Sequence, residues 1–315
     1  MSEDRSGHKL PPAAEERMAE IRRSGTWGSA LSADEFTAIR SVGFEPVGQV
    51  LGAAVYNIGY TGGWACPGAW AGYGGYVTPY QSVTSTSGAG GMGSFGPMVQ
   101  TLYQARHRAL GRMSEECAEL GGHGVVGVIL SIGAFPAGGM EFKAIGTAVR
   151  APGGTALKRP FTSDLSGQDF AKLILADWVP VGMAMGISIG ARHDDWLTIN
   201  QTRWGSGNAE VTGYTDLVNE SRHDARIQLD RDVARMGGQG VVVKTMDIRI
   251  RDRECPMTEH RKDHIAEVTI IGTAITKFTR SRARAAGRAG SLAILSLDPQ
   301  RRQAARVRLG KTDTQ

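Results

Sequence analysis

The strongest constraint on the fold is an internal repeat, because a duplicated segment must build the same supersecondary unit twice. Residues 31–52 (LSADEFTAIRSVGFEPVGQVLG) and 165–186 (LSGQDFAKLILADWVPVGMAMG) are identical at seven of 22 aligned positions. Two shorter pairs of blocks follow in the same order, at 119–128 with 235–244 and at 144–150 with 270–276. The three offsets are 134, 116 and 126 residues, so only the connections differ in length. We therefore expect two tandem units of about 110 residues each.

Each unit shows the same succession of patterns. In the first unit a short helix begins at the N-cap Ser32, and an apolar strand follows Pro46. A long amphipathic helix over roughly 97–120 ends at a glycine pair and precedes two further strands. The second unit repeats this with a strand at 180–189, a helix at 211–236 and strands at 241–250 and 264–275. The predicted class is α+β, with two tandem βαββ units that each pack one long helix on a small sheet.

Composition divides the chain into five segments. A helix with a linker is predicted at 1–30, the first unit at 31–150 with an insert at 59–98, a linker at 151–164, the second unit at 165–276 and an Arg-rich tail at 277–315.

The net charge of +5 is unevenly distributed. The tail at 277–315 holds 10 basic and 2 acidic residues, whereas the preceding residues hold 26 and 29. An anionic partner, such as nucleic-acid phosphate or anionic lipid, is therefore expected only for the tail, and the alternatives are that the tail docks on the acidic body or a partner, or that it is solvated. No apolar run reaches the roughly 18 residues of a transmembrane helix, and no signal peptide or disulfide framework is evident, so we predict a cytoplasmic protein.

The long helix and the strands after it carry a family resemblance. The segment YQARHRALGRMSEECAELGGHGVVGV (103–128) with GTAV (146–149) resembles the YbjQ-like proteins, a family of small bacterial proteins associated with heavy-metal binding. The second copy, at 220–244 and 272–275, is more divergent. The resemblance implies a βαββ unit like that of dodecin subunits, ring-shaped homo-oligomers that are typically pentamers, and no established reaction. Because five is odd, two units per chain cannot simply fill two places of one such ring.

One local cluster offers metal ligands. Cys255, His260 and His264 lie in CPMTEHRKDH, between the last two strands of the second unit. Thiolate and imidazole are the ligands that transition metals prefer, so we predict a transition-metal ion as the cofactor. The alternative is an exposed polar turn.

Two further groups of residues are candidates for ligand or interface contacts. Arg106 and Arg222 occupy equivalent positions within the apolar stripes of the two long helices. A buried cation needs a partner, so we expect a structural ion pair, with an anionic ligand as the alternative. The insert holds 12 glycines and 7 aromatic residues in 40 positions. Its Trp64, Trp70 and Tyr73 could bind a ligand or partner, or cover the protein's own sheet.

The sequence contains no nucleophile elbow, P-loop or HExxH motif, so we do not expect an enzyme. The leading prediction is a non-catalytic oligomeric protein that binds a heavy metal or a small ligand. The alternative is a structural or adaptor ring that holds a protein, membrane or nucleic acid through its insert and tail.

Overall fold

A computed structural model describes most of the chain. The described residues are 10–26, 28–57, 83, 95–136, 139–151, 153, 159–203, 207–255 and 262–278. All of them belong to one compact unit that ends at Phe278. None of the helices within the described ranges is long and apolar enough to cross a membrane.

The first half of the fold follows the predicted order of elements. The N-terminal helix α1 (Pro12–Ser24) comes first, and a capping box at Ser32 then starts α2. The elements that follow are α2 (Ala33–Ser41), β1 (Glu45–Tyr56), α3 (Gly96–Glu119), β2 (Gly124–Phe135) and β3 (Gly139–Arg150). This is one βαββ unit preceded by a short helix.

The second half repeats the order. Its elements are β4 (Phe161–Thr162), α4 (Gly167–Leu175), β5 (Trp178–His193), α5 (Trp196–Thr202), α6 (Thr212–Arg235), β6 (Gly240–Glu254) and β7 (Lys262–Lys277). The short elements β4 and α5 are additions to the pattern. The predicted α+β class with two βαββ units, each placing one long helix on a small sheet, is confirmed.

Strand order and register match between the two halves. The sheets run β1-β3-β2-β4 and β5-β7-β6, and the three core strands of each pair antiparallel. The register of the first strand shifts between Pro46 and Gly48 in one sheet and between Pro180 and Gly182 in the other. Thus the repeat extends to single irregularities of the backbone.

The threonine of the repeated GTA motif has the same role in both units. Thr147 Oγ1 lies 3.2 Å from Ser29 Oγ and accepts a hydrogen bond from the backbone N–H of the residue after Ser29 at 3.1 Å. Thr273 Oγ1 lies 3.0 Å from Ser163 Oγ and likewise accepts the next N–H at 3.1 Å. The motif therefore fixes the segment that leads into α2 or α4 against the last strand of its own unit.

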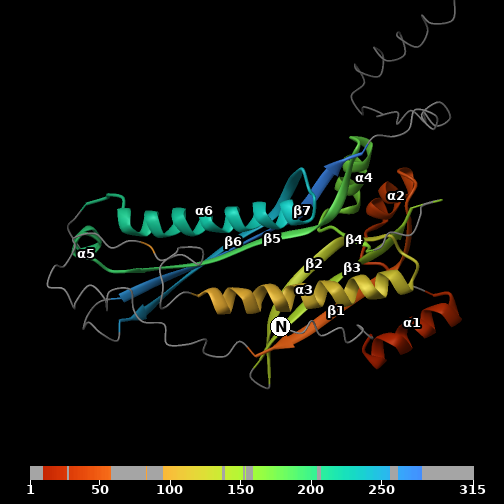
Figure 1. The fold of residues 1–315 in the computed structure, drawn as a ribbon, viewed down its shortest axis with the longest axis horizontal. Helices are drawn as coiled ribbons and strands as arrows, with labels where there is room; N and C mark the ends of the chain where they lie inside the picture. Colours follow the sequence, from red (N-terminus) through yellow and green to blue (C-terminus); the bar gives the residue numbers. More distant parts are fainter. Residues whose placement is uncertain are drawn as a thin grey trace, which may run out of the picture. The chain divides into compact units, whose positions relative to one another are not determined.

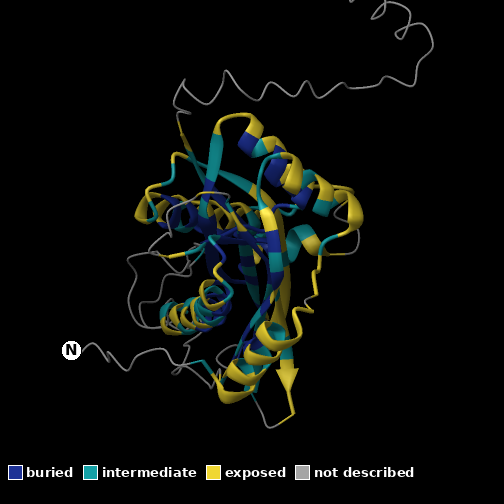
Figure 2. Cartoon of the chain, turned by 90° about the vertical axis from the view of Figure 1, so that its right-hand side faces the viewer, coloured by how far each residue is buried: buried dark blue, intermediate teal, exposed yellow. Residues whose placement is uncertain are grey.

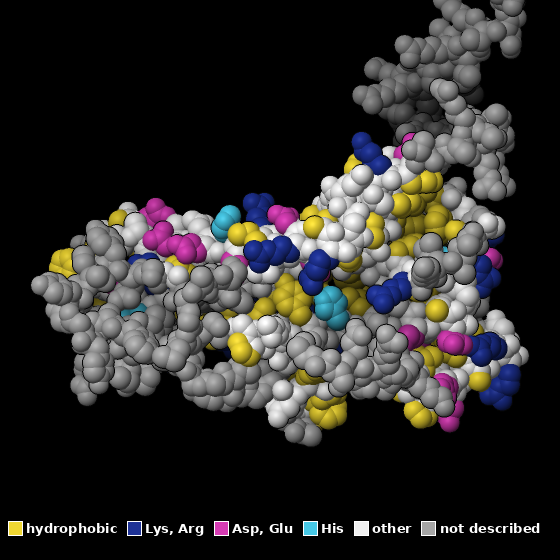
Figure 3. Space-filling view, viewed as in Figure 1, with side chains coloured by type: hydrophobic (Ala, Val, Ile, Leu, Met, Phe, Trp, Pro, Cys, Tyr) yellow, Lys and Arg dark blue, Asp and Glu magenta, His cyan; other side chains and the backbone are white. Residues whose placement is uncertain are grey.

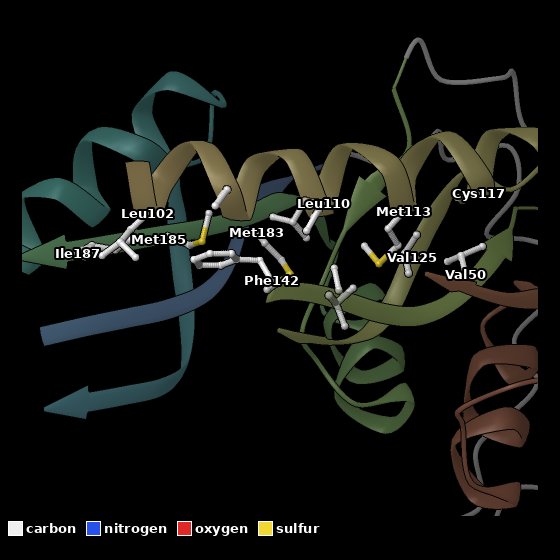
Figure 4. Packing of buried hydrophobic residues seen from close by; sticks show 14 of the residues in the cluster. Val50, Leu102, Leu110, Met113, Cys117, Val125, Phe142, Met183, Met185 and Ile187 are labelled. Atoms are coloured by element: carbon white, nitrogen blue, oxygen red, sulfur yellow. The ribbon is translucent and has the colours of Figure 1, made fainter. Parts of the chain in front are cut away.

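The two units share one hydrophobic core because β5 is covered on both faces. Met183, Met185, Ile187 and Ile189 belong to a cluster with buried residues of α3, whereas Ala184 belongs to a cluster with α6. Figure 1 shows α6 on one side of this sheet and α3 on the other, and Figure 4 shows the packing beneath α3. β5 is accordingly buried almost continuously, whereas β1 alternates, as expected for a strand covered on one face.

The segment before α4 completes the joint between the units. Residues 161 and 162, placed in the linker by their composition, form β4 and pair in parallel with β2. The Ser163 N–H then donates to Val125 O at 2.9 Å, and α4 packs on α2. Figure 2 shows buried residues concentrated in the strands and exposed residues on the outward sides of helices.

Candidate metal centre

The strands of the second sheet extend further than those of the first, and their ends bring three metal-ligating side chains together. β5 and β7 have 16 residues each and β6 has 15, whereas β1, β2 and β3 have 12 each. His193 ends β5 and lies opposite Asp263 of β7 in the register. Cys255 directly follows β6. The extension therefore carries all three residues, whereas the described strands β1 and β3 of the first unit do not reach the positions that correspond to His193 and Asp263.

The three side chains form a tight and buried group. One ligand atom from each of His193, Cys255 and Asp263 lies within 4.8 Å of the others. His193 Nδ1 lies 2.8 Å from Asp263 Oδ1, and Arg253 Nη2 approaches the other carboxylate oxygen at 3.5 Å. Asp263 is fully buried, and removing its charge from water costs free energy. The contacts with His193 and Arg253 offset that cost.

The donor set is that of a transition-metal site. A thiolate, an imidazole nitrogen and a carboxylate oxygen together suit Zn²⁺ and similar divalent ions, whereas Mg²⁺ and Ca²⁺ prefer oxygen ligands alone. The residues present therefore fit the expected metal. Arg253, by holding the free carboxylate oxygen of Asp263, is placed to orient that ligand from outside the coordination sphere.

His264, one of the three predicted ligands, belongs to a neighbouring group. Its Nε2 lies 3.0 Å from Asp194 Oδ1 and 3.1 Å from the hydroxyl of Tyr214. Successive residues of a strand point to opposite faces, so His264 and Asp263 lie on different sides of β7. Burial and then the Asp194 carboxylate raise the pKa of Tyr214 to about 12, so this hydroxyl stays protonated near neutral pH.

The structure describes only some of the other residues that the sequence offers as ligands or contacts. Cys255 lies in the cluster, whereas His260 and the insert residues Trp64, Trp70 and Tyr73 lie outside the described residues. Tail residues 279–315 do as well. Cys117 is buried in the core, and desolvation raises the pKa of its thiol to about 12. Such a thiol is a poor metal ligand, because ligation requires the thiolate.

The two equivalent arginines occupy opposite environments. Arg106 is 4% exposed and lies over the ring of Phe142, with 5.8 Å between its guanidinium carbon and the ring centroid. Burial lowers the pKa of Arg106, and the negative charge of Glu267 opposes that shift. Arg222, by contrast, is exposed. The expectation that both lie within buried stripes is therefore wrong for Arg222, because no second sheet in the described part of the chain covers α6 as β5 covers α3.

Sequence reasoning did not find His193 and Asp263. Both residues stand beside apolar strand patterns, within RHDD and KDH, but 70 residues separate them along the chain. Their proximity depends on the strand register, which places position 193 opposite position 263.

Two comparisons with known proteins relate the chain to others. Residues 80–152 match a family model described as "Putative heavy-metal-binding", which agrees with the YbjQ-like resemblance of the first unit. The "Encapsulin nanocompartment protein Rv1762c" of Mycobacterium tuberculosis is 32% identical over 244 residues, which span 74% of this chain and 81% of that protein. The family-model match covers α3, β2 and β3 and does not include the His–Cys–Asp cluster.

Proposed function

Because the chain belongs to the family of the mycobacterial encapsulin nanocompartment protein, and carries a YbjQ-like segment, we propose that it is a non-catalytic, self-assembling metal-binding protein. We assign the metal to His193, Cys255 and Asp263. The observation that carries this assignment is the convergence of three buried donors of different chemistry within 4.8 Å.

A borderline divalent ion such as Zn²⁺ fits this site best. Cys and His favour it, and one carboxylate is a common further ligand. Binding releases the thiol proton, because sulfur binds the ion as the thiolate, and the imidazole must carry its proton on the nitrogen that does not face the ion. His193 Nδ1 shares a hydrogen bond with Asp263 in the metal-free arrangement, and an ion would replace the proton that joins them.

The ion would also serve the fold. Its ligands come from the ends of β5, β6 and β7, so one ion links all three strands of the second sheet. A ligand that binds only the folded state stabilises it in proportion to the logarithm of its free concentration over Kd. We therefore expect added Zn²⁺ to raise the thermal unfolding midpoint of the apoprotein.

The test is the metal content and Zn²⁺ affinity of the full-length protein without a His-tag. We expect about one transition-metal ion per chain, removable by a chelator. Cys255→Ser, His193→Gln and Asp263→Asn should each weaken Zn²⁺ binding by about tenfold or more. Each variant should also lose the Zn²⁺-dependent rise in the unfolding midpoint.

Two matched variants separate this site from the one predicted from sequence. His264→Gln alters the neighbouring residue of the same strand, and His260→Ala alters the remaining predicted ligand. Both should keep wild-type Zn²⁺ affinity. Loss of binding in these variants with retention in His193→Gln would replace the proposed site by Cys255, His260 and His264, and absence of binding in the wild type would remove the metal function.

The family relation also supports a proposal on the oligomeric state in which the chain binds metal. The relative is named for an encapsulin nanocompartment, and we infer that this chain also works within a large protein assembly. Light scattering of the purified protein should then give one discrete mass well above that of a single chain.

A further inference from the structure

We propose that the second unit of each chain binds the first unit of a second copy, through the same contacts that join the two units within one chain. Such a head-to-tail interface uses two different surfaces of the protein, so docking can be repeated from copy to copy, and it gives a ring where the rotation between copies closes. Two surfaces are open among the described residues, and neither includes a residue of the proposed metal site.

The first open surface is one flank of α6. On α3 the corresponding flank holds Arg106 and Leu110, which are both buried, and Leu110 belongs to the cluster that includes β5 residues of the second sheet. The equivalent residues of α6, Arg222 and Arg226 at an offset of 116, are exposed. Figure 3 shows charged side chains spread along α6. The repeated helix thus has a flank that is covered in one unit and open in the other.

The second open surface is the face of the first sheet that points away from α3. Leu51, Val55 and Ile145 are the counterparts of the β5 and β7 residues that pack against α3. Val55 is 49% exposed, and Ile129, which pairs with Ile145 across the strands, is 64% exposed. This partly apolar sheet face corresponds to the one that covers α3 within the chain.

Charge complements the match of these two surfaces. Within the chain, burial lowers the pKa of Arg106 and the negative charge of Glu267 opposes that shift, while Glu267 itself pairs with Arg251 at 3.1 Å. Glu267 corresponds at an offset of 126 to Glu141, which lies on the open face of the first sheet. Docking by the same geometry would place Glu141 of a second copy next to Arg222. The exposed arginine would then face a carboxylate of the neighbouring copy, as Arg106 feels the charge of Glu267 within the chain.

The third element is an open strand edge. Within the chain, Ser163 is fully buried because it extends β4 alongside β2. Its counterpart Ser29 is exposed, although Thr147 holds it in the same way. In the second unit the strand that corresponds to β2 is β6, and Val243 on β6 is 45% exposed. In the docked pair the Ser29 segment of one copy would lie beside Val243 of the other and complete the sheet.

The test is sedimentation velocity of the untagged full-length protein with charge-reversal variants. Arg222→Glu and Glu141→Arg should each weaken association by about tenfold or more, because like charges then face each other. The double variant restores opposite charges and should recover assembly. In the wild-type assembly the amides of Ser29 and Val243 should exchange hydrogen slowly, and in Arg222→Glu they should exchange quickly.

Arg231→Glu is the matched control, since position 231 lies two and a half turns from Arg222 and therefore on the other flank of α6. It should assemble as the wild type does. Circular dichroism should show that all variants fold, and the metal content of Arg222→Glu should be unchanged, so the interface and the metal site can fail separately. A monomeric wild type, equal dissociation of the Arg231→Glu control, or a double variant that does not recover would overturn the proposal.

Discussion

At the scale of single residues, the threonine of the GTA motif is the most informative position. Thr273 is fully buried. Its hydroxyl oxygen forms a hydrogen bond with the Ser163 hydroxyl and accepts one from the N–H of Asp164. Thr273→Val keeps the shape but leaves these buried groups without that partner, at a cost of about 1–3 kcal/mol in the free energy of unfolding. Urea unfolding measures this change. Thr273→Ser keeps the hydroxyl and should cost clearly less, and equal losses in the two variants would contradict the hydrogen-bonding role.

The proposed metal ligands show how far residue-level prediction can go. Cys255 could be chosen as a candidate from its side chain, because it is a soft donor near histidines in the sequence. The partners His193 and Asp263 could not, because their proximity depends on which residues of β5 and β7 pair. A one-residue change of register would send Asp263 to the other face and bring His264 toward Cys255. Composition carries no information on that register.

At the scale of elements, helix and strand approach each other most closely at one glycine in each unit. A Cβ added to Gly52 would lie 1.9 Å from the carbonyl oxygen of Ala109, and one added to Gly186 would lie 2.0 Å from that of Ala225. The backbones must separate to accept a methyl group. We expect Gly52→Ala and Gly186→Ala each to lower the free energy of unfolding by about 1–3 kcal/mol, as overpacking does.

Thermal or urea unfolding of these glycine variants gives the measurement. Gly133→Ala is the control on β2, where an added Cβ meets nothing within 4 Å. It should change stability by less than about 0.5 kcal/mol. If all three variants behave alike, close packing is not the reason for glycine at the two repeated positions.

Elements with a strong hydrophobic periodicity were predictable from the sequence, whereas an element that forms only through contacts with a neighbouring strand was not. The long helix expected at 97–120 is Gly96–Glu119, and the one at 211–236 is Thr212–Arg235. The two residues of β4 have no periodicity of their own and exist as a strand because β2 lies beside them. The last two residues of β5, Arg192 and His193, are polar, so the hydrophobic pattern stops before the strand does.

At the scale of the whole molecule, the packing of the two units on each other could not be predicted from the sequence. The run VGMAMGISIG in β5 indicates a strand buried on both faces, but it does not say which element supplies the second cover. That cover is α3 of the other unit. Arg106 and Arg222 look alike in the sequence because helical periodicity describes a position on its own helix and not the neighbouring unit.

The shared core predicts that the two units unfold together. Met185 of β5 is fully buried in the cluster that contains residues of α3. Met185→Ala should lower the free energy of unfolding by about 2–5 kcal/mol. Because the lost packing belongs to both units, hydrogen exchange of the β1 and β3 amides should accelerate to the same extent as that of β5 and β7. Ile250→Ala, at a position that is 56% exposed, should leave both sets of amides unchanged. Faster exchange confined to β5 and β7 would mean that the first unit is stable without the second, and the interface inside the chain would then resemble a contact between separate domains rather than one core.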